Sequence, residues 1–82
     1  MKSTQTWHVS ITLADDGADV TARARLADGS VDVVGLGTVS TAVTEASGES
    51  PYELAAVRSL QSLSEALSYA AESDRYGALD QA

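Results

Sequence analysis

Hydrophobic and polar residues alternate in two segments near the start of the chain. This period-2 pattern is typical of β-strands that bury one face. Asp15-Asp16-Gly17 follows the first segment and Asp28-Gly29 follows the second, and each supplies a glycine that suits a tight hairpin turn. We therefore expect strands over about residues 5–14 and 19–27, joined as hairpins. The apolar positions are Trp7, Val9, Ile11 and Leu13 in the first strand and Val20, Ala22, Ala24 and Leu26 in the second.

A third strand is expected over about residues 31–40. It begins with alternating residues, but Gly35-Leu36-Gly37 interrupts the alternation, as a β-bulge or a close-packing site would. The following segment, residues 38–44, is rich in β-branched residues and either extends this strand or forms a separate arm. We expect residues 41–49 to be a loop.

The sharpest structural signal is a helix start at Ser50-Pro51-Tyr52-Glu53. Serine caps free amides, proline suits the first helical position, and glutamate three residues after the cap can complete a capping box. We expect a helix over about residues 51–73 and a frayed tail over residues 77–82. One stripe of this helix should cover the sheet, namely Tyr52, Ala56, Leu60, Leu63, Leu67 and Ala70.

These elements predict a single α+β domain over residues 1–82, with a three-stranded antiparallel sheet packed against one long C-terminal helix. Such a helix, about 39 Å long if it reached residue 76, would overhang a strand of about 27 Å. The small chain also has no cysteine to form a stabilising disulfide. We therefore expect a homodimer, with candidate interface residues Leu54, Val57, Arg58 and Tyr69.

The composition limits the classes of partner that the chain is expected to bind. Twelve acidic and five basic side chains give a net charge of -7, which disfavours generic nucleic-acid binding. Neither a signal-peptide pattern nor a stretch long enough to span a membrane is present, so we expect a cytoplasmic protein.

No set of residues predicts an enzyme, a metal site or a cofactor site. His8 is the sole histidine and has no partners in a recognised catalytic spacing, so it is interpreted as a solvated residue. Asp15, Asp16 and Asp19 crowd one turn but lack the spacing of a calcium-binding loop. We interpret Trp7 as a core residue rather than a stacking platform.

Arg23 and Arg25 are the most suggestive polar pair, because their spacing places both on one face of the second strand. With Thr21 and His8 they form our candidate macromolecule-binding face. The competing interpretation is that they pair with neighbouring acids such as Asp32.

The order of these motifs resembles a family of small actinobacterial proteins of unknown function with a double-stranded-RNA-binding-domain-like fold. The resemblance covers about residues 7–71. It is carried by Trp7-x-Val9-x-Ile11, Ala22-x-Ala24-x-Leu26-x-Asp28-Gly29, Gly35-x-Gly37 and Glu53-Leu54-Ala55-Ala56-Val57-Arg58-Ser59-Leu60-x-x-Leu63.

This resemblance implies three strands backed by one long helix, a dimer, and a shape likened to ribosome hibernation-promoting factors. The family's arginines and proline after the Gly-x-Gly step are missing here, where residues 38–47 contain no basic residue and include Glu45. The resulting hypothesis is a non-enzymatic dimeric interaction protein, a stress or dormancy factor that associates with ribosomes. The alternative is a small-ligand-binding or enzyme-accessory domain whose site lies at the dimer interface.

Overall fold

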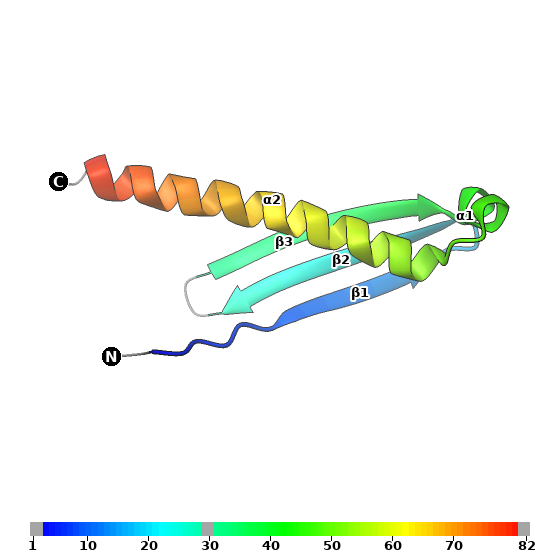
Figure 1. Ribbon diagram of the computed structural model, residues 1–82, viewed down its shortest axis with the longest axis horizontal. Helices are drawn as coiled ribbons and strands as arrows, with labels where there is room; N and C mark the ends of the chain where they lie inside the picture. Colours follow the sequence, from blue (N-terminus) through cyan, green and yellow to red (C-terminus); the bar gives the residue numbers. More distant parts are fainter. Residues whose placement is uncertain (1–2, 29–30, 81–82) are drawn as a thin grey trace.

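The computed structural model describes residues 3–28 and 31–80. Its three strands form an antiparallel sheet in the order β1-β2-β3, and the long helix α2 lies across one face (Figure 1). A short helix, α1, connects the sheet to α2. The expected α+β fold is therefore confirmed, with one helix more than predicted. The elements are β1 Val9–Asp15, β2 Asp19–Asp28, β3 Val31–Ser40, α1 Thr41–Ser47 and α2 Pro51–Asp80.

The two glycines of β3 set the distance between sheet and helix. The strand pairing runs without interruption through Gly35 and Gly37, which lie opposite Ala24 and Ala22 of β2, so of the two alternatives the β-bulge is wrong. A Cβ added at Gly37 would lie only 2.5 Å from the backbone nitrogen of Ser59, and one added at Gly35 would overlap backbone atoms of α2. These glycines are therefore a close-packing site on which the helix backbone rests.

The buried stripe of α2 consists of small residues and one leucine, and it differs from the expected stripe. Ala55 and Ser59 are fully buried, and Leu63 is 5% exposed, whereas Leu60 is 42% exposed. The small side chains face the sheet because only they fit against the glycines of β3. The apolar core comprises Val20, Ala22, Val39 and Ala55 in one cluster and Ala24, Leu26 and Leu63 in the other.

The expectation that the first strand buries one face is also wrong. Every residue of β1 is exposed, although Val9, Ile11 and Leu13 share the helix-facing side with buried residues of β2. Trp7, expected in the core, is 45% exposed. The physical reason is the position of α2, which packs over β2 and β3, where the small residues lie, and leaves all of β1 except its C-terminal end uncovered.

The expected loop over residues 41–49 is mostly helical, because α1 spans Thr41–Ser47. The Thr41 backbone nitrogen and hydroxyl both donate to the Ala18 carbonyl, at 2.9 and 3.0 Å, which ties α1 to the β1–β2 turn. Gly48 ends α1 in a left-handed conformation with φ of 77°, and its N–H donates to the Glu45 carbonyl. Tertiary contacts and this cap thus override the β-branched composition of the segment.

The long helix begins at Pro51, as predicted, where the Leu54 N–H donates to the Ser50 carbonyl at 3.1 Å. The helix continues to Asp80, so the expected end near residue 73 is wrong. Residues 77–80, expected to be frayed, are helical, and residues 81–82 of the expected tail lie outside the described residues. Figure 1 shows its C-terminal part extending beyond the sheet.

The overhang makes the molecule elongated. The radius of gyration is 16.4 Å, whereas a compact domain of this length has about 12 Å. Within the part of the chain that the structure describes, no helix is both long enough and apolar enough to cross a membrane.

Candidate functional site

Two exposed surfaces could bind a partner, one on each side of the sheet. The outer face, on the side away from α2, follows from the strand register. The cross-strand rows Thr12-Arg23-Leu36 and Ser10-Arg25-Val34 form its centre, and Thr21 faces Thr38 in the next row. The outer face therefore comprises Ser10, Thr12, Thr21, Arg23, Arg25, Asp32, Val34, Leu36 and Thr38.

One of the two predicted arginines is engaged in an ion pair. Arg25 donates from Nε and Nη2 to the two carboxylate oxygens of Asp32, both at 3.1 Å. These hydrogen bonds and the charge of Arg25 lower the pKa of Asp32, and Asp32 in turn raises the pKa of Arg25. The competing interpretation of Arg25, a pairing with Asp32, is thus confirmed, and this pair lies in solvent.

Arg23 differs from Arg25 because it forms no ion pair or hydrogen bond within the described residues. It lies between Thr12 of β1 and Leu36 of β3, and Leu36 is 59% exposed. The centre of the outer face therefore offers one available cation beside an exposed apolar side chain.

The other two predicted contact residues flank this centre. Thr21 lies on β2, where its hydroxyl is 3.5 Å from the hydroxyl of Thr38. His8 immediately precedes β1 and is exposed. The structure thus places three of the four predicted residues along β2 and the fourth at the end of the adjoining strand. Val34 and Leu36 were missed because the glycines between and beside them suggested an irregular segment.

The second surface is the apolar strip, defined as Trp7, Val9, Ile11 and Leu13. These side chains lie on the same side of the sheet as α2 and are between 38% and 45% exposed. The flank of α2 beside them presents Tyr52 and Leu60, which are similarly exposed. The alternation of β1 predicted an apolar face, but only the position of α2 shows that this face remains uncovered.

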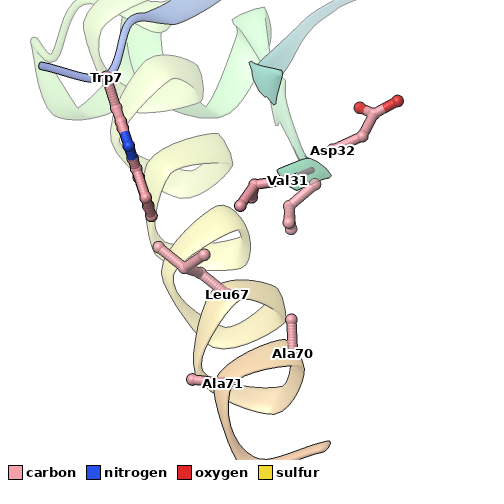
Figure 2. Close-up of a pocket in the computed structure, with 7 residues that line it drawn as sticks. Trp7, Val31, Asp32, Leu67, Ala70 and Ala71 are labelled. Atoms are coloured by element: carbon pink, nitrogen blue, oxygen red, sulfur yellow. The ribbon is translucent and has the colours of Figure 1, made fainter. Parts of the chain in front are cut away.

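An open hollow of about 260 Å³ lies at one end of the apolar strip. In Figure 2 the ring of Trp7 and the side chain of Leu67 border it, while the carboxylate of Asp32 points away. Its remaining lining comes from Val31, Val33, Ala70 and Ala71. The side chains that line the hollow are therefore mostly apolar, and the one charged residue among them, Asp32, directs its carboxylate away from it.

At the other end of the strip, a hydrogen bond holds the start of α2. The Tyr52 hydroxyl donates to Oδ2 of Asp15 at 2.6 Å, while Oδ1 of Asp15 accepts from the Gly17 N–H at 2.8 Å. These two bonds lower the pKa of Asp15, and the bond to Asp15 raises the pKa of Tyr52. The contact fixes the helix start over the end of β1.

The acids of the β1–β2 turn have a structural role. Oδ1 of Asp16 accepts from the N–H groups of Ala18 and Asp19, at 2.9 and 2.7 Å, and these bonds lower the pKa of Asp16. Among the residues whose side chains the structure describes, 3–28 and 31–72, no group of three or more histidines, cysteines or acids is arranged to hold a metal ion.

The four predicted dimer-interface residues occupy different environments on α2. Leu54 is half-buried against the protein's own core, and Arg58 donates from Nη1 to the Thr38 carbonyl at 3.0 Å. Val57 is exposed, and Tyr69 is 74% exposed. Leu54 and Val57 border a second open hollow of about 410 Å³, which does not include Tyr69.

Comparison with known protein families gives a match to nearly the whole chain. No curated protein matches the chain. The match to a family runs over residues 5–81, which include all three strands and both helices. The chain therefore belongs to the Rv2632c-like family, a family of small domains.

Proposed function

We propose that this chain is a non-enzymatic interaction protein that binds a macromolecular partner through the outer face of its sheet. The observation that carries the proposal is Arg23, a cation without an ion-pair partner within the described residues, beside the exposed side chain of Leu36. Cations and exposed apolar side chains together are characteristic of recognition surfaces.

The charge distribution supports an acidic partner for this face. The chain has a net charge of -7, yet Arg23 is bordered across the strands by the uncharged Thr12 and Leu36. Two acids lie on the same side of the sheet, namely Asp32, which is already paired with Arg25, and Asp19, which lies four residues before Arg23 on β2. A local positive site on an acidic protein gives an oriented contact while the remaining surface repels indiscriminate binding to polyanions.

The ribosome is the specific partner that we propose, because the sequence resembles proteins likened in shape to hibernation-promoting factors. Shape likeness transfers function poorly, so the outer face must supply the contact. In this proposal Arg23 meets an acidic group of the ribosome, and Leu36 packs beside it.

Cosedimentation with purified ribosomes across a salt series tests this function. We expect pelleting at low salt that declines as salt rises, because an exposed charge contact is screened. Arg23→Gln should reduce the pelleted fraction several-fold, roughly the loss of one charge-assisted contact. Absence of pelleting at the lowest salt would contradict ribosome association.

Ser64→Asp is the matched control, since it also lowers the net charge by one unit and lies at an exposed position of α2. If Ser64→Asp weakened pelleting as much as Arg23→Gln, overall charge and not the outer face would govern the association. Circular dichroism and thermal unfolding of both variants report whether either change disturbs the fold.

The second candidate is a small-ligand-binding domain, which the hollow beside Trp7 favours. A ligand there would be small and largely apolar, because six of the seven lining residues are apolar and the volume of about 260 Å³ lies just below the usual range of ligand pockets. Binding of such a ligand would raise the melting temperature and quench or shift Trp7 fluorescence. A screen of small apolar compounds without either effect would leave only the interaction function.

A further inference from the structure

The outer edge of β1 is the least protected part of the sheet. β1 pairs only with β2 among the described strands, so one of its edges is free. Natural proteins guard free edges with charged residues, prolines, bulges or a covering element. Residues 9–14 contain no charge and no proline, and the pairing with β2 shows no bulge.

The alternation of hydrogen-bonded and non-hydrogen-bonded positions along β1 shows which backbone groups point to the free edge. Asp16 donates from its N–H to the Asp19 carbonyl at 3.1 Å, across the β1–β2 turn. In an antiparallel pair, hydrogen-bonded and non-hydrogen-bonded positions alternate, so the even-numbered residues of β1 bond to β2. The N–H and C=O groups that point to the free edge therefore belong to Val9, Ile11 and Leu13.

The same three residues carry the exposed side chains of the apolar strip. One set of positions thus presents both unpaired backbone groups and uncovered apolar side chains. A partner that pairs with this edge satisfies the backbone and covers part of the apolar strip at once. An edge with both features is a template for another β-strand.

We propose that a second copy of this chain pairs with the edge, β1 against β1 in antiparallel orientation and centred on Ile11, to form a continuous six-stranded sheet. This surface is separate from the outer face. In this register Ile11 faces Ile11 of the second copy, and Val9 faces Leu13. The outward-pointing backbone groups of all three residues then find partners in both copies.

The pattern of β1 is self-complementary only when odd-numbered residues meet odd-numbered residues. Centring on Ile11 meets this requirement and keeps every apolar side chain on the helix-facing side. Shifting the centre by one residue towards the C-terminus would bring Asp15 into the paired region opposite Val9. Centring on Ile11 places Asp15 outside the three bonded pairs.

The charge distribution favours contact between two copies at this part of the surface. Two chains with a net charge of -7 each repel one another, so contact is most favourable where acids are absent. Residues 1–14 contain none of the twelve acidic residues. The two-fold pairing also places both α2 helices on one side of the sheet, so that the two apolar strips adjoin and cover each other.

The mass in solution gives the first test, measured by sedimentation equilibrium over a concentration series. We expect a species of twice the 8.5 kDa chain mass at high concentration. Ile11→Lys should weaken dimerisation by roughly tenfold or more, because it removes an apolar pair and sets two like charges opposite each other. The control Leu36→Lys makes the same chemical change at an exposed strand position on the outer face and should leave the dimer intact.

Cross-linking tests the register and does not depend on the stability of the lysine variant. The natural chain has no cysteine, so a single introduced cysteine reports one position. Ile11→Cys should form a disulfide-linked dimer under mild oxidation, because the residue faces its own copy. His8→Cys should cross-link at least several-fold less, since it would lie opposite Ala14.

Two results would overturn the proposal. If the chain stays monomeric at millimolar concentration, a second copy does not pair with the free edge of β1. A dimer that survives Ile11→Lys and cross-links through Val57→Cys or Tyr69→Cys assembles through α2, as the sequence alone suggested. Neither measurement involves ribosomes. The proposed ribosome association can therefore be contradicted while the dimer is confirmed, and the dimer can be contradicted while ribosome association is confirmed.

Discussion

The two edge strands, β1 and β3, have different sequences and opposite surroundings. β3 is covered by α2, with Gly35 and Gly37 in contact with the helix backbone and Arg58 donating to the Thr38 carbonyl. β1 is uncovered and exposes Ile11 and its neighbours on both faces. The comparison teaches that the small residues of β3, and not the larger apolar residues of β1, determined where the helix packs.

The close-packing site should show the largest effect. Gly35→Val places a branched side chain against backbone atoms of Ser59 and Leu63, which cannot move aside without shifting α2. We expect a loss of about 3 kcal/mol or more in the free energy of unfolding, the upper part of the range for overpacking. Urea unfolding measures this loss in the free energy of unfolding.

Leu36→Val is the control, because it changes the same strand on the opposite, exposed face. If Gly35→Val unfolded at the same urea concentration as this control, the helix would not rest on the glycines.

The two neighbouring leucines of α2 provide a sharper comparison. Leu63→Ala should lower the free energy of unfolding by about 2 to 4 kcal/mol, because Leu63 is buried in the core beside Ala24 and Leu26. Leu60→Ala, made on the exposed flank, should cost less than about 1 kcal/mol. Equal losses in thermal or urea unfolding would mean that Leu60 is buried in solution.

A smaller effect is expected at the hydrogen bond between Tyr52 and Asp15. The pKa of Asp15 is lowered by this bond, so its stabilising contribution is present above the ordinary value of 3.8 and is lost as pH falls through the lower folded-state pKa. The Tyr52→Phe variant should therefore have a lower free energy of unfolding than the natural chain at pH 7. As the pH falls from 4 to 2, the free energy of unfolding should decrease less for the variant than for the natural chain.

The alkaline side tests the same contact in the opposite direction. Asp15 raises the pKa of Tyr52, so that contribution is present below the ordinary value of 10.0 and is lost as pH rises through the higher folded-state pKa. Asp15→Asn should reduce this alkaline dependence. Thermal unfolding as a function of pH measures both the acid and the alkaline dependence of stability. Tyr69→Phe, on the exposed part of α2, is the control.

The smallest effect is expected at the ion pair of the outer face. Arg25 lowers the pKa of Asp32, so Arg25→Gln should raise that pKa toward 3.8 while leaving the fold nearly as stable as before. An NMR titration of the Asp32 carboxyl carbon reports this shift. No change in the titration midpoint would mean that the pair does not persist in solution.

Most secondary structure was predictable because it depends on local pattern. The period-2 alternation predicted the first two strands and the start of the third, and Ser50-Pro51 predicted where α2 begins. The helical segment of residues 41–47 was not predictable in the same way. Its β-branched residues favour extended structure, and its stability depends on Thr44, which is buried, and on the anchoring of Thr41 to Ala18.

The outer face was partly predictable for the same reason. Alternation places Arg23 and Arg25 on one side of a strand whatever the fold around them. Which arginine is paired was not predictable, because the choice between them depends on where β3 brings Asp32.

The sequence by itself determined the α+β class, the hairpin order and the start of the long helix, because each depends on the intrinsic preferences of neighbouring residues. Only the tertiary structure decided which apolar face is buried. Ile11 and Leu63 both lie on regular apolar stripes, yet only Leu63 is enclosed. A single helix can cover only part of a three-stranded sheet, and close contact drew it to the glycines and alanines of β2 and β3 and away from β1.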